Sequence, residues 1–307
     1  MKITVIGAGN VGATTVQRLA DAELANEIVM LDILDGIPQG KSLDIWETAP
    51  VMGYDSRVIG TNDYKDTANS DIIVMTAGLA RKPGMSRDDL LKANVDIVAP
   101  CIKQASAVSP NAIILMVSNP LDVMTYVALK VTHWDHHRVF GMAGILDTCR
   151  YRSFIALELD VSVRDIQAMV LGGHGDTMVP LPRYTTVGSI PLSHLLPKER
   201  IDAIVDRTRG GGGEIVKYLK TGSAYYAPSA AVVEMVESIV KDKKRILPCC
   251  AWLTGQYGHK DVMMGVPCVL GKKGLVKILE IPLNEEEKKM FDTSVGHVRE
   301  TMAIVQL

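Results

Sequence analysis

A glycine motif near the start of the chain limits the folds open to this sequence more than any other feature. Gly7-Ala8-Gly9-Asn10-Val11-Gly12 follows an apolar, β-branched run at residues 3–6 and opens a helical pattern. In this setting the first glycine permits a tight turn, the second lets the backbone approach a pyrophosphate, and the third lets the helix pack on the strand. Free N–H groups at the helix N-terminus would bind the phosphates. The motif therefore predicts a dinucleotide-binding unit.

An acidic residue at the end of the second predicted strand indicates which dinucleotide is bound. Asp32 stands 20 residues after Gly12, where a carboxylate can accept hydrogen bonds from the ribose hydroxyls of an adenosine. The same carboxylate would repel a 2'-phosphate, so we expect NAD rather than NADP. The alternative interpretation is that the glycines make only a tight turn and that Asp32 only caps a following helix.

Strand and helix patterns alternate through the first 142 residues. Short β-branched runs predict strands at residues 3–6, 27–31, 71–76, 112–117 and 138–140. Between them, residues 11–22 and 88–107 place apolar side chains along one helical stripe. This alternation predicts an α/β fold with a doubly wound, parallel (Rossmann) sheet in a dinucleotide-binding domain over residues 1–142.

The pattern changes beyond residue 142. Long helices are predicted at residues 146–159, 199–219 and 230–241, and strands at 245–253 and 262–270. Asn284 can cap a last helix whose first turn is acidic. The run Gly210–Gly213 is expected to mark a kink or a close helix contact. We therefore expect an α+β substrate and catalytic domain over residues 143–307, in line with the two domains that 307 residues suggest.

Charge and cysteine content exclude several classes of protein. The 33 Lys and Arg residues balance 35 Asp and Glu residues, and a net charge of -2 argues against a nucleic-acid-binding surface. Apolar runs are too short to span a membrane, and the first residues lack the features of a signal peptide. Five scattered cysteines predict free thiols. We expect a cytoplasmic protein with no nucleic-acid or membrane partner.

Charged residues follow the predicted strands at the edge of the sheet where ligands bind. Residues 78–87 form a glycine-punctuated segment that carries Arg81 and Arg87, which suits a lid that closes over a substrate. The alternative interpretation of this segment is a solvated basic loop. Asn119 ends the strand predicted at residues 112–117, and so also lies at a carboxyl edge.

Two further segments of the second half carry candidate site residues. Asp147 and Arg150 are three apart and share one face of a predicted helix. His174 lies within Gly172–Asp176, where the glycines leave its ring reachable. We predict no metal site, because the pair His136 and His137 has no Cys or carboxylate partner at the spacing of a metal site.

Taken together, these motifs resemble the lactate and malate dehydrogenases, and most closely the prokaryotic malate dehydrogenases of the lactate-dehydrogenase-like type. The resemblance covers essentially the whole chain. It is carried by the glycine motif, by Arg81–Arg87, by Ser118–Pro120, by Asp147–Arg150 and by Gly172–Asp176.

The resemblance implies that a 2-hydroxy acid loses a hydroxyl proton while hydride passes to NAD. His174 would be the acid/base catalyst, with Asp147 fixing its tautomer. Arg150 would bind the substrate's 1-carboxylate in a two-pronged ion pair. Arg87 would polarise the substrate carbonyl, and Asn119 would bind the same oxygen.

Other residues would bind the cofactor and select the substrate. The residues implied for the nicotinamide half are Asn94, Val117, Ser118 and Asn119. Arg81 would pair with the second carboxylate of oxaloacetate, where lactate enzymes carry glutamine, and Ala224 would leave room for it, where they usually carry threonine. The resemblance thus implies oxidation of malate to oxaloacetate with formation of NADH, in the citric acid cycle. It also implies a homo-oligomer, with a tetramer favoured over a dimer.

Three alternatives stay open. The substrate could be lactate or another 2-hydroxy acid. The NAD-dependent glycosidases share this fold, but they carry a metal-binding Cys beside the Asn-Pro pair, where this chain has Ser118. A non-catalytic NAD-binding protein is the third alternative, and it would have no need for His174, Asp147, Arg87 and Arg150 together.

Overall fold

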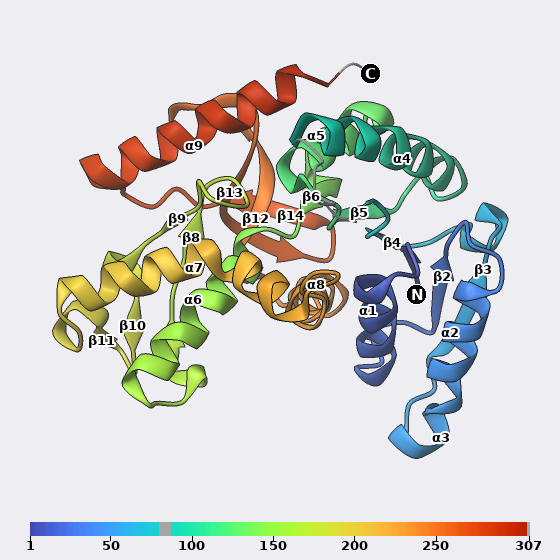
Figure 1. Cartoon of the computed structure of the whole chain (residues 1–307). Coiled ribbons are helices and arrows are strands. Elements are labelled where there is room, and N and C mark those ends of the chain that lie inside the picture. The colour runs from blue at the N-terminus through green and yellow to red at the C-terminus, as the bar shows by residue number, and fades with distance from the viewer. Residues whose placement is uncertain (80–86, 306–307) are drawn as a thin grey trace.

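One nine-stranded sheet runs through both halves of the molecule (Figure 1). The computed structural model describes residues 1–79 and 87–305, with the side chain of Arg87 left out. The strand order is β14-β13-β12-β6-β5-β4-β1-β2-β3. The strands from β3 to β6 are all parallel, in the order 3-2-1-4-5-6 of a doubly wound sheet. The predicted Rossmann sheet is therefore confirmed.

The elements of the first half alternate as predicted. The strands are β1 (Lys2–Ile6), β2 (Glu27–Leu31), β3 (Arg57–Thr61), β4 (Ile72–Met75), β5 (Ile113–Met116) and β6 (Val139–Gly141). The helices are α1 (Asn10–Asp21), α2 (Ile37–Glu47), α3 (Ala49–Met52), α4 (Arg87–Val108) and α5 (Leu121–Thr132). Strands β4 and β5 are continuously apolar and fully buried, because helices cover the sheet on both faces. In Figure 1, α4 and α5 lie on one side of the sheet and α1 lies on the other.

Strand β3 is the one parallel strand that the sequence patterns did not predict. It is the edge strand, begins with the exposed Arg57 and contains Gly60, so it lacks a continuous apolar run. A Cβ atom on Gly60 would lie 2.1 Å from the carbonyl oxygen of Pro38. The glycine is therefore needed for the close approach of α2, and this approach weakens the strand pattern in the sequence.

The second half combines long helices with strands, as predicted, and its long strands pair antiparallel. Its helices are α6 (Gly144–Leu159), α7 (Lys198–Leu219), α8 (Tyr226–Val240) and α9 (Glu285–Ala303). The long strands are β12 (Arg245–Thr254), β13 (Lys260–Gly271) and β14 (Gly274–Ile278). Short strands complete this half: β7 (Ile166–Gln167), β8 (Val170–Leu171), β9 (Val179–Pro180), β10 (Thr186–Val187) and β11 (Ile190–Pro191). No helix among the described residues is long and apolar enough to cross a membrane.

The two halves are joined within the sheet. Strand β12 pairs antiparallel with β6 through Cys250 and Gly141. A Cβ atom on Gly141 would lie 2.5 Å from Oγ1 of Thr125 and 3.2 Å from Cβ of Cys250. Glycine at this position therefore allows the strand of one half to contact the strand of the other.

Two local predictions can be compared directly with the structure. Asn284 caps α9 as predicted: its Oδ1 accepts from the N–H of Glu287 at 2.8 Å, and Oε2 of Glu287 accepts from the N–H of Asn284 at 2.9 Å. The run Gly210–Gly213 lies inside the continuous helix α7. The prediction of a close contact there is confirmed, because α7 packs against α6 at this point.

Candidate active site

The three glycines of the first motif differ in what surrounds them. Gly7 has a φ of +105°, and a Cβ atom there would lie 2.7 Å from Oγ1 of Thr76. A Cβ atom on Gly12 would lie 1.8 Å from the carbonyl oxygen of Gly7. A Cβ atom on Gly9 would meet no described atom within 4 Å. The protein's own packing therefore explains the first and third glycines, whereas the second faces open space that a pyrophosphate can use.

The N-terminus of α1 is open to an anion. Gly9 occupies the N-cap position without a side-chain cap, and the first turn from Asn10 contains no acidic residue. Helix N-termini with free N–H groups attract phosphates through hydrogen bonds and the helix dipole. The loop that includes Ala8 and Val11 thus has the form that the sequence motif predicts.

Asp32 lies beside the glycine loop. Its Oδ2 accepts from the N–H of Ala8 at 2.6 Å, and its Oδ1 accepts from the N–H of Leu34 at 3.0 Å. The carboxylate therefore also holds the turn that follows β2, but it does not cap the next helix, α2, whose N-cap Gly36 has no side-chain cap among the described residues, so the helix cap of the alternative interpretation is not found. Lys41 on α2, which the sequence analysis missed, donates from Nζ to the carbonyl oxygen of Ala8 at 2.7 Å. It adds a cation beside the predicted phosphate site.

Asn94 joins the segments that follow β4 and β5. It lies on α4, is fully buried, and accepts at Oδ1 from the N–H of Leu79 at 2.7 Å. Its Nδ2 donates to the carbonyl oxygens of Asn119 at 2.6 Å and Leu79 at 3.1 Å. Because the protein uses both ends of this amide, contact between Asn94 and the nicotinamide half stays a prediction.

The residues at the end of β5 lie where the sequence places them. Val117 and Ser118 are buried, and Oγ of Ser118 donates to the carbonyl oxygen of Ala77 at 2.6 Å. Asn119 is exposed and precedes Pro120 through a cis peptide bond. The carboxyl ends of β4 and β5 are thus hydrogen-bonded to each other at the edge of the sheet where nucleotides bind.

His174, Asp147 and Arg150 come together as the sequence analysis expected. Nδ1 of His174 lies 2.9 Å from Oδ2 of Asp147, and Nη1 of Arg150 donates to Oδ1 of the same carboxylate at 3.2 Å. The Asp147 side chain is 2% exposed, so both interactions are shielded from water. Nε of Arg150 is also buried and has no hydrogen-bond partner among the described residues.

The pKa of His174 reflects opposing influences. Burial disfavours the imidazolium, but the charge of Asp147, the hydrogen bond to it and the charge of Asp122 outweigh burial and hold the pKa of His174 above its ordinary value. Arg150 opposes this effect. The ring therefore binds a proton more readily than an isolated histidine does, as suits an acid/base catalyst.

The glycines around His174 have a structural role that the sequence analysis did not anticipate. Gly172 exchanges two backbone hydrogen bonds with Gly265 on β13, at 2.9 and 3.2 Å. The N–H of Gly173 donates to Oγ of Ser294 on α9 at 2.8 Å, and a Cβ atom there would lie 2.8 Å from Cγ2 of Val298. These glycines let the loop pack tightly against two other elements, so they fix the backbone of His174.

Arg150 contacts the glycine run of α7. A Cβ atom on Gly211 would lie 3.1 Å from Cδ of Arg150, and one on Gly212 would lie 3.6 Å from its Nη2. A Cβ atom at Gly211 would therefore be in tight contact with the Arg150 side chain, whereas one at Gly212 would be in ordinary van der Waals contact.

The structure does not test the roles predicted for two arginines and one alanine. Arg81 lies outside the described residues, and so does the side chain of Arg87, the first residue of α4. Ala224 is half-buried in the connection between α7 and α8. The roles assigned to these residues stay predictions.

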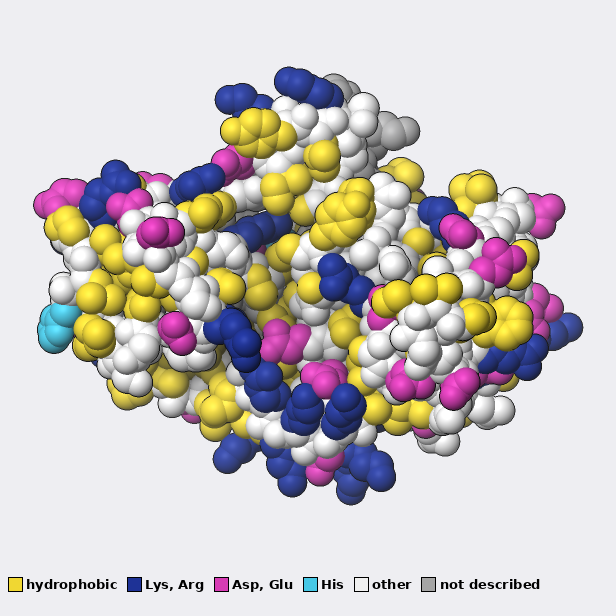
Figure 2. All heavy atoms as spheres, turned by 90° about the horizontal axis from the view of Figure 1, so that it is seen from below, with side chains coloured by type: hydrophobic (Ala, Val, Ile, Leu, Met, Phe, Trp, Pro, Cys, Tyr) yellow, Lys and Arg dark blue, Asp and Glu magenta, His cyan; other side chains and the backbone are white. Residues whose placement is uncertain are grey.

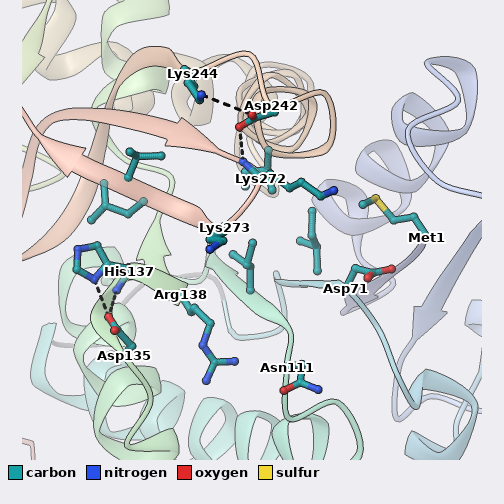
Figure 3. Close-up of a pocket in the computed structure, with 15 residues that line it drawn as sticks. Met1, Asp71, Asn111, Asp135, His137, Arg138, Asp242, Lys244, Lys272 and Lys273 are labelled. Atoms are coloured by element: carbon teal, nitrogen blue, oxygen red, sulfur yellow. Dashed lines mark hydrogen bonds and ion pairs between the residues drawn. The ribbon is translucent and has the colours of Figure 1, made fainter.

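A cavity of about 850 Å³ lies away from these residues (Figure 3). It is at the amino ends of β4 and β5, and its walls include Lys272, Lys273 and Arg138. None of the predicted site residues lines it. The cavity is therefore separate from the candidate active site, which is at the carboxyl ends of the strands.

The expectation that no carboxylate stands near His136 and His137 is wrong. The ligand atoms of these two residues and Asp135 lie within 4.8 Å of one another. Oδ1 of Asp135 accepts from the N–H of His137 at 2.9 Å and lies 2.7 Å from Nδ1 of its ring, so it caps the short helical turn His136–Arg138. The cluster is partly exposed, and two of its residues line the 850 Å³ cavity.

Comparisons with known proteins identify the family of this chain. Residues 1–141 match the family model for the NAD-binding domain of lactate/malate dehydrogenases, and residues 145–306 match that for their α/β C-terminal domain. A malate dehydrogenase of Chloroherpeton thalassium is 60% identical over 98% of this chain and 97% of its own length. One of a Roseiflexus species is 57% identical over 99% and 98%.

Solved structures show the same likeness. The malate dehydrogenase of Salinibacter ruber has a TM-score of 0.95 and 55% identity, with 99% of this chain and 97% of that chain covered. The lactate dehydrogenase of Cryptosporidium parvum, solved with lactic acid and NAD, has a TM-score of 0.95 and 42% identity, with 99% and 97% covered. The chain therefore belongs to the lactate/malate dehydrogenase family and is an NAD-dependent oxidoreductase.

Proposed function

We propose that this chain is a malate dehydrogenase that interconverts malate and oxaloacetate. The observation that carries the chemistry is the buried pair of His174 and Asp147, 2.9 Å apart, with Arg150 bonded to the same carboxylate. The curated relatives named malate dehydrogenase, at 56–60% identity, support this choice of substrate.

His174 would act as the acid/base catalyst. If its Nδ1 donates a hydrogen bond to Asp147, its Nε2 has a lone pair that can accept the hydroxyl proton of malate. NAD, when bound, would supply the acceptor for the hydride from the carbon atom that carries the hydroxyl group. In the reverse direction the imidazolium returns the proton to the carbonyl oxygen of oxaloacetate. Asp147 stabilises the imidazolium in both directions.

Arg150 would bind the 1-carboxylate of the substrate. Its guanidinium is oriented by Asp147 on one side and confined by Gly211 and Gly212 on the other. A planar guanidinium can make two parallel hydrogen bonds to a carboxylate, which fixes the substrate's orientation as well as its position. The hydroxyl-bearing carbon would thereby be held next to His174. Arg87 would polarise the carbonyl, and Asn119 would bind its oxygen.

The choice of malate over lactate depends on Arg81 and Ala224. A second carboxylate would pair with Arg81, whereas pyruvate would leave that charge unpaired, and stranding a desolvated charge is costly. The fold does not distinguish the substrates, because the Cryptosporidium parvum lactate dehydrogenase is as similar in structure as the malate dehydrogenases are. Lactate or another 2-hydroxy acid is therefore the second candidate substrate.

A spectrophotometric assay tests the proposal. NADH oxidation is measured with oxaloacetate and with pyruvate, at equal enzyme concentration. We expect kcat/KM to be far higher for oxaloacetate. A higher value for pyruvate would make the chain a lactate dehydrogenase. No turnover of either substrate would leave a dehydrogenase of another 2-hydroxy acid or a non-catalytic NAD-binding protein.

We also propose a homo-oligomer, preferably a tetramer. Helices α2 and α3 carry large apolar side chains that are exposed, which is typical of surfaces that bind another subunit. They are Ile37, Leu43, Trp46, Val51 and Met52. Helix α3 lies at the lower end of the molecule in Figure 1, and Figure 2 shows hydrophobic side chains among charged ones on that side. Sedimentation equilibrium measures the number of subunits.

The proposal also covers the cellular location of the enzyme, its metabolic pathway and its domain boundary. We place the enzyme in the cytoplasm and its reaction in the citric acid cycle. Five free thiols, three of them buried, suit a reducing compartment. We place the domain boundary between residues 142 and 143, because β6 ends at Gly141 and α6 begins at Gly144.

A further inference from the structure

Asp122 is a buried carboxylate beside the proposed base, and the proposed mechanism does not use it. It lies in the first turn of α5, three residues after Asn119, and is 5% exposed. Its Oδ2 accepts from the backbone N–H of His174 at 2.8 Å. Its Oδ1 is buried, and the thiol of Cys250 on β12 is the further hydrogen-bonding group beside the carboxylate. Buried carboxylates are costly, so this one calls for an explanation.

Asp122 and Asp147 hold His174 at two different points. Asp147 on α6 binds the ring at Nδ1, whereas Asp122 on α5 binds the backbone N–H. The loop is also tied by Ser294, whose Oγ accepts from the N–H of Gly173. Of the two side chains that, within the described part of the chain, accept from backbone N–H groups of this loop, Ser294 is neutral and Asp122 is ionisable.

The ionisable groups that act on Asp122 come from three segments: His174 on its loop, Asp147 on α6 and Cys250 on β12. Arg150, also on α6, acts on His174. Burial raises the pKa of the Asp122 carboxyl, and the hydrogen bond and charge of His174 act against this rise. The coupling is mutual, since the Asp122 charge raises the pKa of His174. Ionised Asp122 and protonated His174 therefore stabilise each other.

We propose that Asp122 is a positioning residue that fixes the backbone of His174 and, as a second carboxylate, stabilises its protonated ring. The inference rests on the proposed acid/base role of His174. Asp122 belongs to the segment that carries Asn119, so α5 links the cofactor side of the site directly to the base. The second carboxylate strengthens the proton affinity that Asp147 alone would give the ring.

The variant Asp122→Asn separates the effect of the Asp122 charge from the effect of its hydrogen bond to the His174 backbone. Asn keeps the shape and an oxygen that can accept from the His174 N–H, but it removes the charge. We expect the pKa of the base in the pH profile of kcat/KM to move downward. At pH values above this pKa, kcat/KM for oxaloacetate reduction should fall by about 3- to 30-fold. This is less than the roughly 10²- to 10⁴-fold loss expected when an acid/base group is removed.

Ser294→Ala is the matched control. It removes the neutral tie to the same loop and leaves every charge in place. It should lower the midpoint of thermal unfolding without moving the pKa in the pH profile. Should the Asn variant not fold, Asp122→Ser also removes the charge, but its hydroxyl is one bond shorter, so Ser294→Ala shows what the loss of one tie to the loop does by itself.

A second measurement does not depend on turnover. Diethyl pyrocarbonate acylates neutral histidine, so the pH dependence of acylation at His174, followed by peptide mass spectrometry, reports the proton affinity of the ring in the free enzyme. We expect the Asp122→Asn profile to lie at lower pH than that of the unmodified chain. Superimposable acylation profiles overturn the proposal. Loss of the proposed function would instead appear as absent turnover in the unmodified chain, while the acylation profiles still test the coupling.

Discussion

His174 and Asp147 are 27 positions apart in the chain, yet Nδ1 of the histidine lies 2.9 Å from Oδ2 of the aspartate. The aspartate is in the first turn of α6, and the histidine is in the loop between β8 and β9. The pair is also linked to the first half of the chain, because Asp122 on α5 binds the backbone of His174. The candidate base is therefore fixed by both halves of the molecule.

Replacing the base should abolish most turnover. His174→Asn should lower kcat by about 10²- to 10⁴-fold, because it removes the group that exchanges the proton. NADH binding, followed by fluorescence, should change little, since the glycine loop and Asp32 lie on other segments. His194→Asn, at an exposed position, is the control and should keep full activity. Turnover that survives in His174→Asn would exclude the assigned role.

The raised pKa of His174 gives opposite pH profiles for the two directions of the reaction. Burial favours the neutral ring, but the charge and hydrogen bond of Asp147 outweigh it, so protonation persists to higher pH than in an isolated histidine. Malate oxidation needs the neutral ring, so its kcat/KM should rise with pH through this pKa. Oxaloacetate reduction needs the protonated ring and should fall over the same interval. Initial rates across the neutral range measure both, and parallel profiles would contradict the assignment.

Gly9→Ala should separate cofactor binding from folding. The backbone of Gly9 has φ -68° and ψ -173°, which alanine can adopt, and its Cβ atom would meet no described atom within 4 Å. The thermal midpoint should therefore stay close to that of the unmodified chain, while NADH affinity falls because the methyl group occupies the predicted pyrophosphate space. Gly12→Ala is the contrast: its Cβ would lie 1.8 Å from the oxygen of Gly7, so it should destabilise the fold. Unchanged NADH affinity in Gly9→Ala would argue against this binding mode.

Gly211→Ala should weaken substrate binding through Arg150. Its Cβ atom would lie 3.1 Å from Cδ of Arg150, so the guanidinium has to shift. We expect a higher KM for oxaloacetate with little change in KM for NADH. Gly213→Ala in the same helix is the matched control, because its Cβ atom would meet no described atom within 4 Å. Both variants gain about 0.5–1 kcal/mol of helix propensity, so a KM effect common to both would point to the helix and not to Arg150.

Arg81→Gln should change the choice of substrate. The predicted pair between Arg81 and the second carboxylate is charge-assisted, and its loss should cost about 2–5 kcal/mol, or roughly 30-fold to several-thousand-fold in kcat/KM for oxaloacetate. Pyruvate should gain less, because Ala224 leaves space that a methyl group fills poorly. The ratio of the two kcat/KM values measures the effect, and an unchanged ratio would remove the main support for malate.

Motifs with a characteristic spacing could be predicted from the sequence. The glycine loop and Asp32 are 24 positions apart but belong to one strand–helix–strand unit, and the Asn284 cap contacts a residue three positions away, so spacing alone carries the signal. Asp122 could not be found in this way. It resembles an ordinary first-turn acidic residue of a helix, and its partner His174 is 52 positions away.

Lys41 and β3 were missed for a related reason. The Lys41 side chain reaches the backbone of Ala8 across 33 positions, and nothing in the helical pattern of α2 marks it. Strand β3 has a glycine, Gly60, where α2 approaches closely. Because this position carries no apolar side chain, the strand lacks the apolar pattern that identifies strands in a sequence. Contacts of this kind join distant segments and belong to no sequence motif, so a single sequence does not reveal them.

The pairing of β6 with β12 also restricts how the enzyme can enclose its substrate. Since Cys250 and Gly141 join the two halves within one sheet, rotating one half against the other would break backbone hydrogen bonds in the middle of the core. A hinge of the kind that closes two-lobed binding proteins is therefore unavailable to this molecule. Water has to be excluded by segments at the rim of the sheet, so the base can stay fixed in the core of the molecule while the substrate is enclosed.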